Sequence, residues 1–167
     1  MAEREIPNEP GVYVLIIEST KEKEITIGHL GLHHFPNGLY AYVGSALGKR
    51  GQNLRVRIQR HLSSEKKKRW HIDYLLCSGN VAIVAVTYSE TRSRMECSVS
   101  RSMEDSGMIS LVKGFGSSDC RESCQSHLHY FSNGTLEQLT SDLHEIYETL
   151  GLMPKTLSTR NQPTPNI

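Results

Sequence analysis

Two short tyrosine motifs, one arginine and one glutamate are the residues of this chain whose types and order could do chemistry together. The motifs are Gly11-Val12-Tyr13 and Tyr42-Val43-Gly44; Arg57 follows them at the rim of the next predicted helix, and Glu96 comes later. Phenol oxygens and a planar guanidinium fork can hold and polarise the oxygens of a phosphate. Residues of these types therefore indicate phosphodiester chemistry.

Positive charge is concentrated in one part of the chain, although the formal net charge of the whole sequence is only +1. Between residues 49 and 69, nine Lys or Arg residues stand against Glu65 alone, so the local formal charge is +8. Such a stripe can release counterions from a nucleic-acid backbone, although by itself it would equally suit two solvated helix surfaces. The residues that we expect to contact nucleic acid are Lys49, Arg50, Arg55, Arg60, His61, Lys66, Lys67 and Lys68.

The hydrophobic patterns predict an α/β (α+β) fold, with a small mixed or antiparallel central sheet flanked by helices. Strands are predicted at residues 11–18, 24–30, 39–44, 81–87 and 109–113, and helices at 53–62, 66–77, 94–104 and 135–151. Asn53 is the expected N-cap of the first helix, and Gly151 is expected to end the last. The two tyrosine motifs then fall on neighbouring antiparallel strands of one sheet.

The length of 167 residues suits one domain, which we expect to span residues 1–153. Residues 154–167 contain three prolines and few large apolar side chains, so a disordered tail is expected there. The sequence has no run of 18 apolar residues and no apolar segment after a basic start, which predicts neither a membrane span nor a secretory signal. We therefore expect a cytoplasmic protein whose four cysteines are reduced thiols.

The order of these motifs resembles that of the GIY-YIG nuclease family, and especially its uncharacterised stand-alone subgroup, which is also found fused to endonuclease III-like glycosylases. The matching runs are PGVYVL at 10–15, YAYVGSA at 40–46, LRVRIQRHL at 54–62, WHIDYLL at 70–76, Glu96-Cys97, and GFGSSDC at 114–120. The resemblance covers about residues 10–131. One departure from the family pattern is that the terminal Asn of some members has no placed equivalent here.

The resemblance implies a role for each of five residues. A single divalent cation, Mg²⁺ or Mn²⁺, would be bound by Glu96, with water filling most of its shell. Tyr13 or Tyr42 would orient or deprotonate the attacking water, and a base role needs nearby positive charge to lower the phenol pKa from about 10. Arg57 would supply that charge and contact the scissile phosphate, and His71 could relay a proton or bind phosphate.

The implied function is that of a metal-dependent endonuclease acting on nucleic acid, DNA in the first place. A repair protein is conceivable as a partner, and no membrane contact is implied. If the chain is an enzyme of this kind, Tyr13, Tyr42, Arg57, His71 and Glu96 must converge on one cleft beside the basic stripe. Two alternatives stay open: a nucleic-acid binding module with little or no cleavage activity, and a protein interaction domain in which the tyrosines are structural.

A second group of candidate ligands lies within ten residues near the end of the resemblance: Cys120, Cys124, His127 and His129. Thiols and imidazoles are the usual ligands of zinc, but this spacing is unlike that of the common zinc fingers. The other interpretation is that residues 114–129 form an ordered loop that closes one side of the cleft, with Asp119 and His127 near the substrate.

Overall fold

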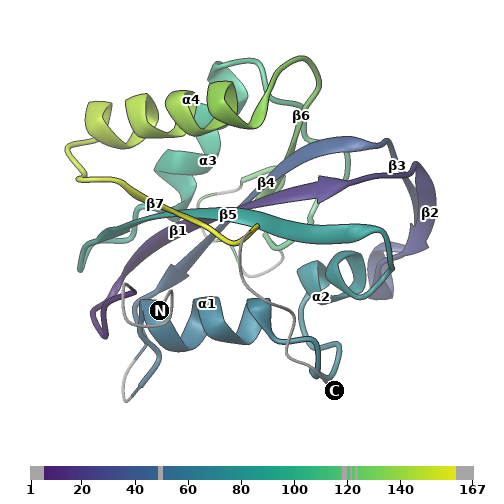
Figure 1. Cartoon of the computed structure of the whole chain (residues 1–167), viewed down its shortest axis with the longest axis horizontal. Coiled ribbons are helices and arrows are strands. Elements are labelled where there is room, and N and C mark those ends of the chain that lie inside the picture. The colour runs from purple at the N-terminus through teal and green to yellow at the C-terminus, as the bar shows by residue number, and fades with distance from the viewer. Residues whose placement is uncertain (1–5, 49–50, 118–119, 121, 123, 161–167) are drawn as a thin grey trace.

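The protein consists of a central sheet between two layers of helices (Figure 1). The computed structural model describes residues 6–48, 51–117, 120, 122 and 124–160. In chain order the elements are β1 (Gly11–Ser19), β2 (Lys23–Thr26), the short 3₁₀ helix η2 (Gly28–Leu30), β3 (Leu32–Phe35), β4 (Gly38–Ala46), α1 (Leu54–Leu62), α2 (His71–Leu76), β5 (Val81–Glu90), α3 (Glu96–Asp105), β6 (Leu128–Phe131), α4 (Leu136–Thr149) and β7 (Lys155–Ser158).

The main sheet has five strands in the order β6-β4-β1-β5-β7, and every neighbouring pair is antiparallel. The strands β2 and β3 form a separate antiparallel pair. Connections without parallel crossovers are typical of an α+β fold, which confirms the predicted class.

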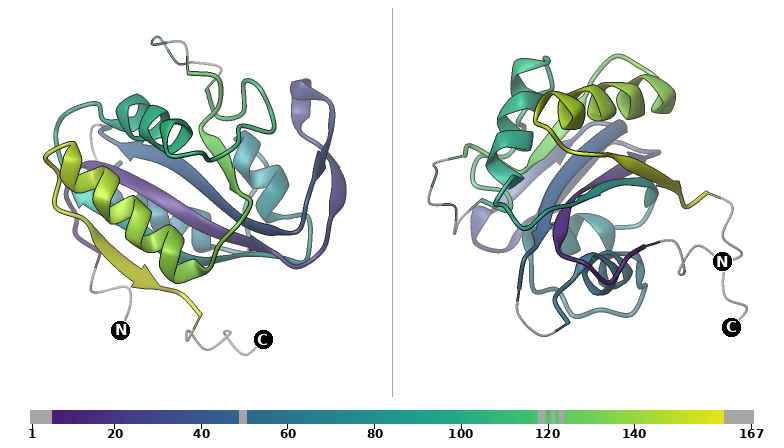
Figure 2. Two further views of the ribbon diagram at one scale, coloured as in Figure 1. Left: turned by 90° about the horizontal axis from the view of Figure 1, so that it is seen from above. Right: turned by 90° about the vertical axis from the view of Figure 1, so that its left-hand side faces the viewer.

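The two faces of the sheet carry different helices. Helices α1 and α2 cover one face, and α3 and α4 cover the other (Figure 2). Alternate side chains of the buried strand β1 serve the two cores, because successive residues of a strand point to opposite faces. Tyr13 and Leu15 pack in the core of the α1 side, whereas Val12 and Val14 pack in the core of the α3 side.

The glycines of the two tyrosine motifs are required by close packing. Gly44 pairs with Tyr13 across β1 and β4, and a Cβ atom at Gly44 would lie 2.6 Å from Cζ of the Tyr13 ring. A Cβ atom at Gly11 would lie 2.3 Å from the carbonyl oxygen of Ser89 on the neighbouring strand. Each motif therefore has a packing explanation that is independent of any activity.

Two predicted helices form with side-chain N-caps, of which the cap of the first was expected. Asn53 accepts a hydrogen bond from the backbone N–H of Val56 at the start of α1, which confirms it as the N-cap. Helix α4 begins after Thr135, whose hydroxyl accepts from the backbone of Gln138 while the Gln138 side chain accepts from the backbone of Thr135. This reciprocal pair fixes the start of the longest helix.

The helix predicted at residues 66–77 is wrong in its first half, because α2 begins only at His71. The buried carboxylate of Asp73 accepts hydrogen bonds from the backbone N–H groups of Arg69 and Trp70. Those bonds satisfy the free donors of a helix start and leave Trp70 in an extended conformation. The helix therefore starts where Asp73 caps it.

Two predicted strands also differ from the structure. The stretch 24–30 is divided between β2 and η2. Gly28 at the start of η2 and Gly31 just after it have φ angles of 46° and 81°. An unpredicted strand, β3, follows. The stretch 109–113 makes only one bridge, between Ile109 and Tyr130, before the chain turns to carry Phe115 into the core. Burial of Phe115 overrides the local strand preference of this segment.

The tail expected from residue 154 is wrong for residues 155–158, which form β7 and pair with β5. Leu157 supplies the physical reason, since it is 9% exposed and belongs to the core of the α1 side. Residues 161–167 lie outside the described part of the chain. In the described residues, no helix is both long and apolar enough to cross a membrane.

Candidate functional site

Tyr13 is buried against His61 on the α1 side of the sheet. Its hydroxyl oxygen lies 2.8 Å from Nε2 of His61, and both residues are 2% exposed. Burial lowers the pKa of the His61 imidazole to about 3, so the ring is neutral near pH 7. The expectation that His61 contacts nucleic acid is wrong, because a buried ring cannot reach a phosphate backbone outside.

Tyr42 lies in a group of rings that leads to His71. The centroid of its ring is 6.1 Å from that of Phe115, which is in turn 5.7 Å from that of His71. Nδ1 of His71 accepts a hydrogen bond of 2.9 Å from the backbone N–H of Gly116, and a Cβ atom at Gly116 would lie 2.9 Å from the Tyr42 ring. The segment around Phe115 and Gly116 therefore positions both Tyr42 and His71.

Arg57 of α1 is half-buried, and its charge acts on both Tyr13 and Tyr42. The carbon centre of its guanidinium lies 5.1 Å from the centroid of the Trp70 ring, a cation–π distance. Its Nε atom is buried and has no hydrogen-bond partner among the described residues. Because buried donors are nearly always paired, the Nε atom makes Arg57 a candidate for binding an anion.

Glu96 is the first residue of α3, in the layer opposite α1. One of its carboxylate oxygens, Oε1, lies 2.9 Å from Nδ1 of His127, and its side chain also accepts a hydrogen bond from Ser45. Burial raises the pKa of Glu96, but the bonds to His127 and Ser45 outweigh burial and lower it. The carboxylate is therefore ionised near pH 7, and its side chain is 28% exposed.

The two layers meet at one edge of β4. Strand β6 pairs with β4 only from Leu39 to Tyr42, and beyond that point the backbone N–H of Val43 donates to the carbonyl of His127. A Cβ atom at Gly116 would lie within 3.4 Å of both the Tyr42 hydroxyl and Cβ of His127, so Gly116 lies between these two residues. His127 in turn contacts Glu96.

The five residues expected to converge are brought together, but from both layers. The charge of Glu96 raises the pKa of Tyr13 and of Tyr42, and the charge of Arg57 lowers the pKa of all three groups. These four groups are therefore close enough to interact electrostatically. His71 joins them through Phe115 and Gly116. Glu96 approaches past the edge of β4 and does not share a sheet face with the tyrosines.

Both phenols are held in the neutral form. Burial is the main cause that raises the pKa of Tyr13 and of Tyr42 above the ordinary value of 10. Arg57 lowers both pKa values, as expected for a nearby cation, but burial and the negative charge of Glu96 outweigh it. In this arrangement the hydroxyls act as hydrogen-bond donors or acceptors and not as bases.

Three residues of the basic stripe have partners within the chain. The guanidinium of Arg60 contacts both oxygens of Asp73, at 3.1 and 2.9 Å, and stacks 3.9 Å from the centroid of the Trp70 ring. Nε of Arg55 donates to the carbonyl of Ile6, and the ammonium of Lys66 donates to the carbonyl of His61. These contacts give Arg55, Arg60 and Lys66 structural roles.

Other residues of the stripe differ in their surroundings. Lys67 and Lys68 are exposed, so their expected contact with nucleic acid stays a prediction. The ammonium of Lys68 lies 5.4 Å from the centroid of the Tyr74 ring. Lys49 and Arg50 lie outside the described residues, as does Asp119, which was expected near the substrate.

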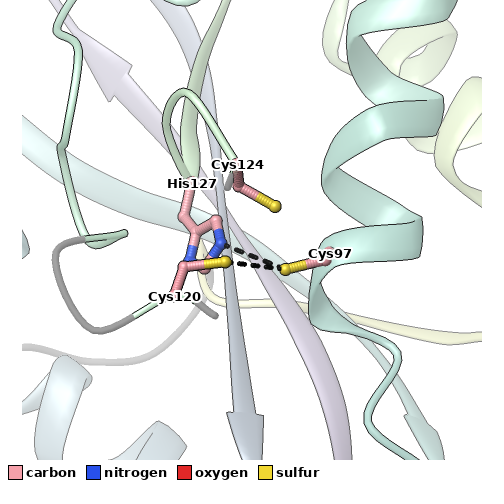
Figure 3. Close-up of side chains that lie close together, drawn as sticks. All are labelled: Cys97, Cys120, Cys124 and His127. Carbon is pink, nitrogen blue, oxygen red and sulfur yellow. Dashed lines mark hydrogen bonds between the residues drawn. The ribbon is translucent and has the colours of Figure 1, made fainter. Parts of the chain in front are cut away.

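Figure 3 shows a cluster of three thiols and one imidazole. The imidazole, that of His127, contacts Glu96. The cluster consists of Cys97, Cys120, Cys124 and His127, and the potential ligand atoms of these residues all lie within 4.8 Å of one another. The sulfur atoms of Cys97 and Cys120 are 3.1 Å apart, and Nε2 of His127 is 3.9 Å from the Cys97 sulfur. Donors of this type at this spacing could hold a metal ion. We call these four residues the Cys/His cluster.

His129, expected as a fourth metal ligand, is not part of the Cys/His cluster. Its ring is buried, with Nε2 2.8 Å from the hydroxyl oxygen of Ser100. Alternate residues of an extended segment point to the same side, so His127 and His129 both face α3. They meet it one turn apart, His127 at Cys97 and His129 at Ser100. Cys97 therefore takes the place that the sequence suggested for His129.

The fold and this site define an α+β domain with a tyrosine group and a Cys/His cluster on either side of one strand edge. The family model described as "Domain of unknown function DUF123" matches residues 12–151, which is most of the chain. The protein belongs to this family. No curated protein and no solved structure matches the chain significantly.

Sequence analysis missed the roles of two residues. The sequence did not indicate Cys97 as a metal ligand, because it lies 23 residues before Cys120, its nearest partner in the Cys/His cluster. His61 was placed on the surface, yet it forms the buried partner of Tyr13. A signal for His61 was present, because it falls near the apolar stripe of α1 that includes Leu54 and Ile58.

Proposed function

We propose that the protein is a metal-dependent nuclease of the GIY-YIG type, which hydrolyses phosphodiester bonds in nucleic acid, DNA in the first place. The observation that carries this proposal is the buried Nε of Arg57, which has no hydrogen-bond partner in the described part of the chain and lies beside two tyrosines and an ionised glutamate. A guanidinium with a free donor at such a place suits the oxygens of a phosphate.

The neutral phenols limit what the tyrosines can do. Tyr42 is 8% exposed, whereas the hydroxyl of Tyr13 is used by His61. We assign to Tyr42 a hydrogen bond that orients water or a phosphoryl oxygen. Tyr13 would have a structural role, in which its contact with His61 holds the site in place. Arg57 would stabilise the negative charge that develops as the water oxygen bonds to phosphorus and the leaving oxygen departs.

Glu96 fits the proposed divalent cation in its chemistry. Mg²⁺ and Mn²⁺ prefer oxygen ligands, and Mg²⁺ is commonly bound by one or two carboxylates while it keeps several waters. The carboxylate of Glu96 is ionised and partly exposed. A cation bound there would supply charge stabilisation for the phosphoryl oxygens and a more acidic water.

The test is cleavage of end-labelled nucleic acids by the purified protein, with Mg²⁺ or Mn²⁺ added or omitted. The panel contains single-stranded, duplex, branched and damaged DNA, and RNA. Arg57→Ala should lower the cleavage rate by about 10²-fold or more, because it removes charge stabilisation in the transition state. Arg69→Ala is the matched control, since it removes the same charge from an exposed residue outside the tyrosine group.

Glu96→Gln should abolish metal-dependent cleavage, because a neutral amide no longer binds the cation. It should leave the affinity for DNA nearly unchanged, because the amide adds no repulsion toward phosphate. Glu145→Gln, at an exposed position of α4, is its control and should cleave at the rate of the natural protein. A copurifying nuclease would ignore all of these changes, and equal activity of Arg57→Ala and Arg69→Ala would contradict the proposed role of Arg57.

A second candidate function is a nucleic-acid binding module without hydrolytic activity. It is favoured by the burial of Tyr13 and by the engagement of Glu96 with His127. Protein that binds members of the panel with a steep salt dependence, but cleaves none of them with either metal, would support the module. Protein that neither binds nor cleaves them at low salt would overturn both candidates.

A further inference from the structure

We propose that Cys97, Cys120, Cys124 and His127 bind one zinc ion in a closed structural centre, and that Glu96 supports this centre through the His127 ring. The proposal is independent of nuclease activity. It rests on the geometry of the Cys/His cluster, on the chemistry of its donors and on the position of Glu96 behind His127.

The spacing of the donors suits a tetrahedral ion. With Zn–S bonds of about 2.3 Å, sulfur ligands at the corners of a tetrahedron lie about 3.8 Å apart. The Cys97 and Cys120 sulfurs are 3.1 Å apart, somewhat closer than this value, and the Cys97 sulfur lies 3.9 Å from Nε2 of His127. All four ligand atoms already lie within 4.8 Å of one another.

The donor set selects both the metal and its role. Soft thiolates favour zinc over the oxygen-seeking Mg²⁺ and Mn²⁺, so this centre is distinct from the cation proposed at Glu96. Three thiolates and one imidazole fill the four positions of zinc and leave none for water or substrate. Such a centre is structural. The three cysteines are half-buried, which gives the ion a path from solvent.

Glu96 and His127 form the arrangement that orients a metal-bound histidine. Nδ1 of His127 lies 2.9 Å from Oε1 of Glu96, while Nε2 faces the thiols. A neutral imidazole that binds metal through Nε2 carries its proton on Nδ1 and donates it to a carboxylate. His127 is 3% exposed, and with its Nδ1 beside Glu96 its Nε2 is the nitrogen that faces the thiols.

The zinc ion would join three parts of the chain that are far apart in sequence. Cys97 belongs to the first turn of α3, Cys120 and Cys124 to the segment after Ser117, and His127 to the residue before β6. The backbone of His127 donates to the carbonyl of Phe115, next to Gly116 and the Tyr42 ring. Zinc would therefore stiffen the segment that positions Tyr42.

The first test is the metal content of the full chain, purified under reducing conditions without chelator and measured by mass spectrometry of the elements. We expect about one zinc per chain. Replacement by Co²⁺ should give the intense visible bands of a tetrahedral ion and thiolate-to-metal charge transfer in the near ultraviolet. Protein that takes up no zinc when titrated with it, that binds iron in its place, or whose mass shows a disulfide between cluster cysteines would overturn the proposal.

Cysteine variants locate the ion. Cys97→Ser and Cys124→Ser should each lose most of the bound zinc, while Cys77→Ser should keep all of it. Cys77 is the matched control, because it is exposed at the end of α2 and outside the Cys/His cluster. Equal zinc content in Cys97→Ser and Cys77→Ser would overturn the assignment. If a cluster variant fails to fold, thiol titration of the natural protein with and without zinc gives the same answer, since zinc should protect three of its four thiols.

The role of Glu96 has its own readout. Glu96→Gln should lower the affinity for zinc by about 10- to 100-fold, as loss of an outer-shell partner commonly does, and Glu145→Gln should leave it unchanged. An unchanged affinity in Glu96→Gln would remove Glu96 from the zinc centre. Zinc binding without any nuclease activity would overturn the proposed function alone, and cleavage by zinc-free protein would leave that function standing without the zinc centre.

Discussion

The two sides of the β4 edge satisfy their polar groups in different ways. On the α1 side, the Tyr13 hydroxyl is paired with His61, and Arg60 with Asp73, all within regular elements. On the α3 side, three thiols and His127 come together from a helix start and an irregular segment, and their sulfurs crowd one another.

On the α1 side the polar groups mostly pair within the chain, whereas the α3 side gathers donors that could hold a metal ion. Buried polar groups that pair with each other fix a single structure, whereas crowded thiols gain little from one another. Arg57 and His61 are exceptions on the α1 side, because the buried Nε of Arg57 and the buried Nδ1 of His61 have no hydrogen-bond partner among the described residues. If the comparison holds, changes on the α1 side should destabilise the fold itself, and metal should matter only to the α3 side.

The largest effect on the α1 side should come from Asp73→Ala. Asp73 is fully buried, and its loss leaves the Arg60 charge and two backbone N–H groups without their acceptor. We expect the free energy of unfolding to fall by about 3 kcal/mol. Urea unfolding followed by circular dichroism measures it, with Asp105→Ala at an exposed position as the control. A loss no greater than that of the control would show that Arg60 is free to bind nucleic acid.

Acid should unfold the α1 side through His61. Its pKa is about 3 in the folded protein, below the ordinary 6.5, so below pH 6.5 the unfolded chain binds a proton that the folded protein refuses. Stability should therefore fall with falling pH, by about 2.3 kcal/mol between pH 6.5 and 4.5 from this group. The contribution of His61 is measured by urea unfolding of the natural protein and of His61→Gln across this pH range. It is the difference between the two proteins in how the free energy of unfolding changes with pH. Parallel curves for the two proteins would mean that His61 titrates normally.

Close packing at the motif glycine should give a smaller loss. In Gly44→Ala the new methyl group would lie 2.6 Å from the Tyr13 ring, and overpacking of this kind costs about 2 kcal/mol. The same change in a Tyr13→Leu background should cost much less, because the ring that it meets is gone. A double-mutant cycle of unfolding free energies checks this coupling, and additive losses would place the strain elsewhere.

The smallest effect concerns the exposed part of the basic stripe. If Lys67 and Lys68 contact phosphates, replacing both with Ala should reduce the slope of log affinity against log salt by up to about 2. Fluorescence anisotropy of a labelled DNA at several salt concentrations gives this slope. The control replaces Arg92 and Lys155, two exposed charges outside the stripe. An identical slope in both double variants would assign the two lysines to solvent.

Regular elements with a strong local signal were predictable from the sequence. The apolar run of β1, the N-cap Asn53 and the periodic apolar positions of α4 each specify their element within a few residues. Short elements such as β6 and β7 were not predictable from the sequence. Each has only four residues, and they form by pairing with β4 and β5. For such segments the partner strand supplies the stability that the local sequence lacks.

The candidate site divides in the same way. The tyrosine motifs and Arg57 were identified from residue type and order, whereas the role of Glu96 was implied only by the family resemblance. Sequence by itself also determined the α+β class through its hydrophobic periods. Only the tertiary structure decided that His61 is buried against Tyr13, that the charge of Glu96 acts on the tyrosines, and that Cys97 belongs to the Cys/His cluster. The physical reason is that burial and ligand geometry depend on distances between segments far apart in the chain, which no local pattern records.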